Sequence, residues 1–210
     1  MTYDQTAFFI GGDWVAPSSS GTIQVISPHT EEVIAIVPEG APADIDAAVA
    51  AARLAFDEGP WPRFSPDERA DALNRLAEAY TARLDDLATT ITAEMGSPIL
   101  FSQLAQAPMP LMMLQYYSDL ARSFAFEEHR QGPLSPTIVR QEPVGVVGAI
   151  APWNVPQFTA MSKLAPALAA GCTVVLKPSP ETPLDGYVLA EIVLEAGLPE
   201  GVVNIVAAGR

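Results

Sequence analysis

Cysteine and histidine are scarce in this sequence, and their scarcity limits the chemistry that the chain can perform. Its 210 residues include one cysteine, Cys172, and two histidines, His29 and His129. A single cysteine excludes an internal disulfide and is typical of a reducing compartment, so we expect a cytoplasmic protein. The two histidines lie far apart in polar stretches, without the ligand spacing of a zinc site, and we expect no bound metal.

Positive charge and long apolar runs are also in short supply. The sequence has 11 Lys and Arg residues against 25 Asp and Glu residues, a formal net charge of −14. Such a surface repels nucleic acid and anionic membranes, so we expect neither as a partner. No apolar run approaches the length of a membrane span, and residues 1–10 lack the basic and apolar segments of a signal peptide. Hydrophobic residues make up 49% of the chain, which indicates one globular domain, or one large domain with an appendage.

The region from Val144 to Lys177 has the pattern of a strand, a helix and a second strand. A nearly continuous apolar run ending at Ile150 predicts a strand that is covered on both faces. Apolar residues at helical spacing follow a short loop bracketed by prolines, Gly171 is expected to end that helix, and residues 173–176 predict the next strand. A unit of this size is typical of a right-handed βαβ crossover between parallel strands.

The alternation continues with a helix over residues 183–196 and a third buried strand over residues 202–206. The second half of the chain is therefore predicted to be a βαβαβ unit, half of a doubly wound parallel sheet, which binds ligands at the carboxyl ends of its strands. No G-x-G-x-x-G motif follows any of these strands, so the usual glycine-rich dinucleotide loop is missing. Lys177, at the end of the second strand, offers another contact to ribose or phosphate oxygens.

The first half of the chain is expected to supply a β meander and several helices. The strand-like segments are residues 8–15, 22–26 and 33–37. Residues 43–56 predict an amphipathic helix, and Ser65-Pro66-Asp67-Glu68 is a strong helix start, from which an apolar stripe continues to Ile91. A third helical region, residues 99–124, contains two prolines that should kink or split it. We expect Tyr116 and Tyr117 of that region to pack in the core.

The segment between the two halves has features of an edge strand. Residues 137–141 alternate in character, and the nearby Pro143 has no backbone donor, which favours a sheet edge or a connection. An unpaired edge can pair with another chain. We therefore expect residues 133–144 to contribute to a homo-oligomer, a dimer or a tetramer.

Several blocks of the sequence resemble the NAD(P)-dependent aldehyde dehydrogenase superfamily. The most specific block is VGVVGAIAPWN at residues 144–154, and the further blocks are FIGGDW at 9–14, EMG at 94–96, KLAPALAAG at 163–171, VVLKP at 174–178, GLP at 197–199 and GVVN at 201–204. Together they cover nearly the whole chain. The resemblance implies an α/β fold with a Rossmann-like parallel sheet, in which residues 1–132 and 145–210 form an incomplete NAD(P)-binding domain.

The resemblance also implies a function for the complete protein, the NAD(P)-dependent oxidation of a small-molecule aldehyde to a carboxylic acid through a cysteine thiohemiacetal. Asn154 matches the asparagine whose side-chain amide stabilises the oxyanion, and Lys163 matches a helix lysine proposed to relay protons. Alternatively, Asn154 caps its loop and Lys163 is an ordinary surface lysine. The positions that match the cofactor cleft are Ile150, Ala151, Pro152, Trp153, Lys177, Ser179 and Pro180. A solvated lysine at the end of a strand is the alternative for Lys177.

One departure from the family pattern concerns the cofactor. The family often has Lys-Pro-Ser/Ala-Glu after this strand, where the glutamate holds ribose hydroxyls, but Pro180 occupies the glutamate position here. Without this carboxylate, NADP remains possible as the cofactor. Glu181, one residue further on, can take the same role, and we therefore expect NAD.

A second departure is that the nucleophilic cysteine, the general-base glutamate and the glycine-rich cofactor loop of the family fall beyond Arg210. Cys172 is no substitute, because it begins a buried strand without a basic sequence neighbour to activate it, and we expect it to be a small core residue.

Two hypotheses remain for the chain. It is the front part of an aldehyde dehydrogenase, or it is a non-catalytic nucleotide-binding or assembly module if the 210 residues are the whole product. The aldehyde is undetermined, since Met112, Met113 and Tyr116 suggest an apolar tunnel but core packing explains them equally well.

Overall fold

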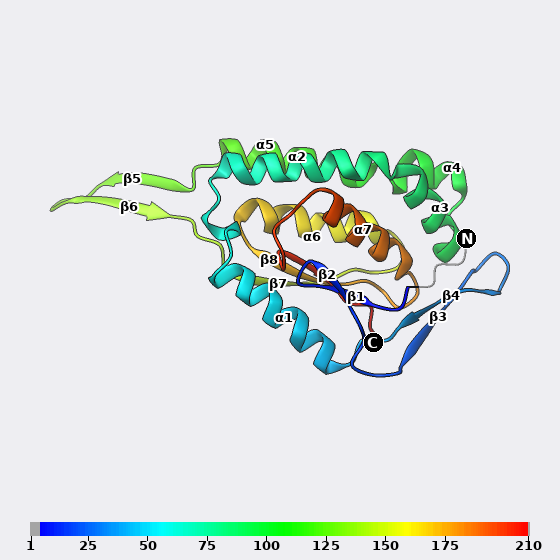
Figure 1. Cartoon of the computed structure of the whole chain (residues 1–210). Helices are drawn as coiled ribbons and strands as arrows, with labels where there is room; N and C mark the ends of the chain where they lie inside the picture. Colours follow the sequence, from blue (N-terminus) through cyan, green and yellow to red (C-terminus); the bar gives the residue numbers. More distant parts are fainter. Residues whose placement is uncertain (1–4, 210) are drawn as a thin grey trace.

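The computed structural model describes residues 5–209 and arranges them as layers of helices on both sides of a central sheet (Figure 1). Residues 1–4, part of the stretch in which no signal peptide is expected, and Arg210 lie outside the described residues. None of the described helices is long and apolar enough to cross a bilayer.

The carboxyl-terminal half forms the predicted βαβαβ unit. Its elements are β7 (Val146–Ile150), α6 (Pro156–Ala170), β8 (Thr173–Lys177), α7 (Leu184–Glu195) and β9 (Val203–Ile205). The three strands are parallel, with Val146 opposite Thr173 and Val174 opposite Val203. Gly171 ends α6 as predicted, in a left-handed conformation with a φ of 93° that glycine adopts without steric cost.

The N-terminal strands form two hairpins in different sheets, whereas the sequence predicted one meander. These strands are β1 (Phe8–Ile10), β2 (Asp13–Val15), β3 (Thr22–Ile26) and β4 (Val33–Pro38). β1 pairs with β2 and also with β9, both antiparallel, so the main sheet has the order β2-β1-β9-β8-β7. β3 and β4 form a separate two-stranded sheet. Buried Asn204 of β9 holds the first hairpin in place, because its side-chain oxygen accepts a hydrogen bond of 2.8 Å from the Gly11 N–H.

Helix α2 (Pro66–Ala82) begins at the predicted capping box. The Glu68 N–H donates to Ser65 Oγ (3.2 Å), and the Ser65 N–H donates to Glu68 Oε2 (2.7 Å). The apolar stripe continues into α3 (Leu84–Met95), but Arg83 leaves helical geometry and divides the stripe between two helices. No glycine or proline marks this break in the sequence. It is held by ion pairs of Arg83 with carboxylates on α3 and α7.

The third helical region is split, as its prolines predicted. Residues Ile99–Phe101 (α4) lead into a π-helical segment, Ser102–Gln106 (η2), and α5 (Met109–Ser123) begins beyond a proline. Tyr117 packs against the core, but Tyr116 is 59% exposed. The prediction that both tyrosines belong to the core is therefore wrong for Tyr116, which lies on the outer face of α5.

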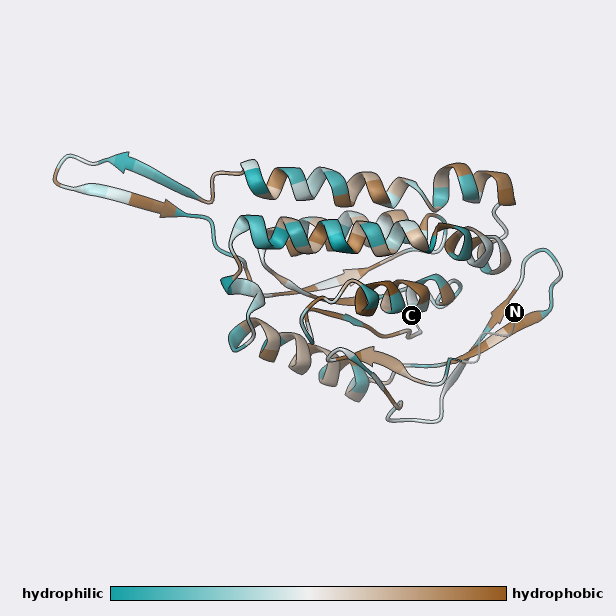
Figure 2. Cartoon of the chain, turned by 45° about the horizontal axis from the view of Figure 1, so that its top comes forward, coloured by the Kyte–Doolittle hydropathy of each residue, from teal (hydrophilic) through white to brown (hydrophobic). Residues whose placement is uncertain are grey.

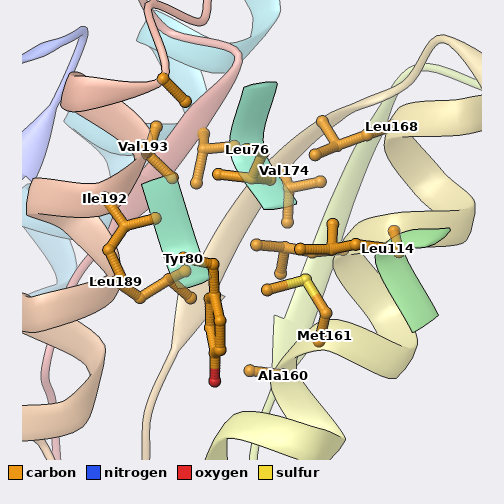
Figure 3. Close-up of a cluster of buried hydrophobic side chains, with 14 of the residues drawn as sticks. Leu76, Tyr80, Leu114, Ala160, Met161, Leu168, Val174, Leu189, Ile192 and Val193 are labelled. Atoms are coloured by element: carbon orange, nitrogen blue, oxygen red, sulfur yellow. The ribbon is translucent and has the colours of Figure 1, made fainter. Parts of the chain in front are cut away.

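Side-chain alternation along β8 divides the apolar core into two parts. Val174 and Leu176 belong to the larger part, with residues of α2, α5, α6 and α7, whereas Val175 belongs to the part that includes α1 (Pro42–Asp57). Helix α1 matches the predicted helix over residues 43–56. Figure 3 shows side chains of the larger part, among them Leu76, Tyr80, Leu114, Met161, Leu168, Leu189 and Ile192.

Strands β5 (Glu127–Gln131) and β6 (Pro136–Arg140) form a hairpin that projects from the layers (Figure 1). β6 matches the predicted edge strand. β5 was not predicted, because its sequence EEHRQ is hydrophilic throughout (Figure 2) and has no apolar alternation. All five of its residues are exposed, including His129, which therefore lies on a strand and remains solvated.

Strand β7 lies at the edge of the main sheet, and the prediction that both of its faces are covered is wrong for the described residues. Ile150 is 67% exposed and Gly148 is also exposed, while only Ala149 is buried. Among the described residues β7 pairs only with β8, so its other edge is free. Val147 and Ala149 pack toward the larger core part and Val146 toward the other, so the run is left open at Gly148 and Ile150.

Candidate active site

The carboxyl ends of β7 and β8 lie side by side and bring together the loops that follow these two strands. Ile150 lies opposite Lys177 in the parallel ladder, and the Ala151 N–H donates to the Lys177 carbonyl oxygen (3.0 Å). The loop with residues 152–154 therefore starts beside the loop with residues 178–182. Both lie at the edge where ligands of doubly wound sheets bind.

A cavity of about 470 Å³ lies against these two loops, β3 and the end of α3. The first loop contributes Trp153, which is 50% exposed, and the second contributes Pro180, Glu181 and Thr182. Glu94 of α3 closes part of the wall. Apolar walls with a few polar groups are typical of small-molecule sites.

The loop after β8 is held in shape by its own side chains. Buried Ser179 donates a hydrogen bond from its hydroxyl to the Glu181 carboxylate, and the Thr182 N–H donates to the Ser179 carbonyl oxygen (3.1 Å). Thr182 Oγ1 is buried and has no hydrogen-bond partner among the described residues. A buried hydroxyl beside a cavity is available to a ligand that enters the cavity.

Glu94 caps the helix that follows this loop. Its carboxylate is 3% exposed, with Oε2 accepting a hydrogen bond from the Leu184 N–H (2.8 Å) and Oε1 from the Asp185 N–H (2.9 Å). These N–H groups open α7 and have no partner inside the helix, so a carboxylate stabilises them. The sequence did not predict this role. The available signal was an acidic residue on the apolar face of a helix, three positions after Ile91.

Asp185 is a second buried carboxyl next to Glu94. No ion pair of either residue with Lys or Arg occurs in the part of the chain that the structure describes, and Asp185 Oδ2 has no hydrogen-bond partner there. Burial raises the pKa of Asp185 to about 7. Burial, and then the charge of Asp185, raise the pKa of Glu94 well above its usual range. Both carboxyls are therefore protonated more readily than exposed carboxyls.

Asn154 lies exposed in the loop between β7 and α6. The next residues begin α6, with Pro156 in its first turn. Within residues 5–209 the side-chain amide of Asn154 forms no hydrogen bond, whereas its backbone carbonyl accepts one from Gln106 Nε2 (3.3 Å). An exposed amide on an anchored backbone is available to donate to a bound oxygen. Gln106 was not predicted, because its contact is made across the fold and leaves no local sequence pattern.

Neither Lys163 nor Cys172 lines the cavity. Lys163 is half-buried on α6, and its Nζ donates to the Thr159 carbonyl oxygen one turn earlier (3.4 Å). Cys172 is 3% exposed and packs in the larger core, as predicted. Across residues 5–209, no group of three or more His, Cys, Asp and Glu side chains is arranged to hold a metal ion.

A model of the aldehyde dehydrogenase family matches residues 14–210. The chain belongs to the aldehyde dehydrogenase family. Among its relatives, the geranial dehydrogenase of Castellaniella defragrans is 44% identical over 211 residues, which cover 100% of this chain and 44% of that protein. The 3-succinoylsemialdehyde-pyridine dehydrogenase of a Pseudomonas species is 43% identical over 206 residues, covering 97% of this chain and 42% of the relative.

Solved aldehyde dehydrogenase structures share this fold. The Mycobacterium tuberculosis enzyme complexed with NAD+ superimposes with a TM-score of 0.96 at 45% identity, covering 100% of this chain and 44% of that chain. Aldehyde dehydrogenase C of Pseudomonas syringae, a mutant complexed with NAD+ and octanal, gives 0.93 at 42% identity, with coverage of 98% and 41%. The predicted α/β fold with a parallel sheet is thus confirmed. The chain spans less than half the length of these relatives.

Proposed function

We propose that the protein containing this chain oxidises an aldehyde to a carboxylic acid with NAD as the hydride acceptor. The observation that carries the proposal is the junction of the Asn154 loop and the Lys177–Thr182 loop at one sheet edge, beside a cavity, in a chain of the aldehyde dehydrogenase family. We assign the family's cysteine nucleophile to a part of the protein outside these 210 residues, because Cys172 is a core residue.

Asn154 is proposed to donate its side-chain amide to the oxygen of the aldehyde as negative charge develops there. A neutral donor that is already fixed in place stabilises such charge without reorganisation at the moment of reaction. The carbonyl of Asn154 is anchored by Gln106, and its amide is exposed. Lys163 is the proposed proton relay, with its Nζ half-buried on the helix that follows the Asn154 loop.

The residues of the cavity fit NAD. Trp153 presents an exposed aromatic face, Thr182 a buried hydroxyl without a partner among the described residues, and Glu181 an exposed carboxylate. Bound there, NAD supplies the acceptor for the hydride. Glu181 is proposed to accept hydrogen bonds from ribose hydroxyls and to repel the 2′-phosphate of NADP, so NAD is preferred. Lys177 and the buried Ser179 belong to the same loop, and they are proposed as cofactor contacts together with Ile150, Ala151, Pro152 and Pro180.

An apolar aldehyde is the substrate class that the neighbouring surface favours. Leu104, Met112 and Tyr116 are 72%, 63% and 59% exposed, and they lie on η2 and α5. η2 contacts the Asn154 loop through Gln106, so this apolar surface starts beside the proposed reaction centre. One structural relative contains octanal, and one curated relative is named for geranial.

The β5–β6 hairpin is proposed to join copies of the protein into a dimer or a tetramer. Both strands are largely exposed and project from the layers (Figure 1). A two-stranded ribbon has free edges along its length, and such edges pair with strands of another chain.

Turnover by the full-length protein tests the proposal. We expect NADH formation with aliphatic and aromatic aldehydes, slower turnover with charged semialdehydes, and a lower rate with NADP than with NAD. An absence of reduced cofactor with every aldehyde of that panel, from a folded protein that binds NAD, would contradict the proposed function.

A non-catalytic nucleotide-binding or assembly module is the second candidate, and the projecting hairpin is the observation that favours it. The intact mass of the native product separates the two. A product of 22.3 kDa that binds NAD and oxidises no aldehyde identifies the module. A longer product that turns over aldehydes identifies the enzyme.

A further inference from the structure

Gln106 is a buried polar residue in an unusual piece of helix. It ends η2, the π-helical segment, and is 4% exposed although its neighbours Gln103 and Leu104 are exposed. A π-helical turn contains one residue more than an α-helical turn and is frequent at functional sites. Burying an amide in this way is costly unless the amide is hydrogen-bonded.

The amide of Gln106 connects two separate parts of the fold. Its Nε2 donates to the Asn154 carbonyl oxygen (3.3 Å) and to Met95 Sδ at the end of α3 (3.6 Å). The π-helical segment is itself fixed to α3, because the Thr92 hydroxyl donates to Ser102 Oγ (2.9 Å). Gln106 is therefore held from α3 and reaches the loop between β7 and α6.

The hydrogen bond to the carbonyl restrains the orientation of Asn154. Fixing the carbonyl oxygen of Asn154 restrains the planar peptide group that follows it, and with it the backbone position from which the Asn154 side chain extends. Within the described residues the Asn154 side chain has no hydrogen bond that would orient it otherwise. The hydrogen bond from Gln106 is thus the polar contact that restrains Asn154, the residue proposed to donate to the oxyanion.

We propose that Gln106 is a positioning residue, which aims the Asn154 amide at the developing oxyanion through the Asn154 carbonyl. This inference rests on the proposed function. A donor stabilises the transition state only where its N–H points to the developing charge, so a loosened Asn154 lowers kcat and leaves the binding of NAD and aldehyde in place.

Gln106→Met in the full-length protein removes the donor and keeps a side chain of similar length. Loss of one such hydrogen bond is expected to lower kcat by about fivefold to tenfold, with the KM values for NAD and aldehyde unchanged. Gln103→Met is the matched control, since Gln103 lies in the same segment and is exposed. It is expected to retain the wild-type kcat.

A double-mutant cycle separates positioning from a merely structural role. In an Asn154→Ala background there is no amide left to aim, so the further change Gln106→Met is expected to leave kcat unaltered. A wild-type kcat in the single variant, or an equal loss of kcat in both backgrounds, would overturn the inference. If Gln106→Met does not fold, Gln106→Leu, which also lacks the donor and carries no charge, takes its place. A wild-type protein that oxidises no aldehyde overturns the proposed function and this inference together.

Discussion

The buried carboxyl of Asp185 makes the free energy of unfolding depend on pH. Burial raises its pKa from 3.8 to about 7. Between these values the folded chain holds a proton that the unfolded chain has released, so the free energy of unfolding falls as pH rises. The loss starts near the lower value and is complete above the higher one. Glu94, whose pKa is also raised, acts in the same direction.

Asp185→Asn tests this linkage. An asparagine resembles the protonated carboxyl and loses no proton, so the decline of stability between about pH 4 and about pH 7 should become shallower. The largest change that one group can cause is about 1.4 kcal/mol per pH unit. Urea unfolding of the chain across this range measures it, with the exposed Asp119→Asn as the control. An unchanged slope in Asp185→Asn would show that this carboxyl does not carry the effect.

The variant Cys172→Ala tests whether Cys172 is a core residue or the nucleophile of the reaction. Because Cys172 is 3% exposed and packs in the core, the variant is expected to lose about 1 kcal/mol of stability and to keep the wild-type kcat in the full-length protein. Thermal unfolding and steady-state kinetics measure the two quantities. Abolished turnover with the fold preserved would assign Cys172 to the reaction instead.

Residue positions were predictable where the signal is local. Cys172 in the core and Lys177 at the end of a strand followed from their sequence neighbours. The capping of α7 by Glu94 and the contact of Gln106 with Asn154 join residues 90 and 48 positions apart. Such contacts depend on packing between elements, which one sequence does not display.

The capping box of α2 makes a prediction at the scale of one element. Ser65→Ala removes the oxygen that accepts from the Glu68 N–H and leaves that N–H without a side-chain partner. The expected cost is about 1 kcal/mol, measured as a lower urea midpoint. Ser20→Ala, at an exposed serine outside the helices, is the control and should leave the midpoint unchanged.

Elements with strong periodicity were predictable, and elements set by their surroundings were not. The βαβαβ unit, α1 and the start of α2 follow from apolar spacing, caps and Gly171. The break at Arg83 depends on carboxylates of α7 that are distant in sequence. β5 is stabilised by pairing with β6 alone, without an apolar face, and β7 has an apolar sequence at an exposed edge.

At the scale of the whole molecule, the projecting hairpin should control assembly. Replacing residues 128–139 of the full-length protein with a short Gly-Ser turn removes both exposed strands and leaves the layered core intact. We expect a smaller assembly by sedimentation and an unchanged unfolding midpoint. An unaltered oligomer would place the interface on another surface.

The central claim is that this chain supplies the oxyanion donor of an NAD-dependent aldehyde dehydrogenase. Comparing kcat of the full-length protein with that of its Asn154→Ala variant tests it most directly, with the Kd for NAD measured in parallel. Removal of one oxyanion donor is expected to lower kcat by about 10²- to 10³-fold and to leave the Kd for NAD unchanged. A wild-type kcat in the variant would contradict the claim.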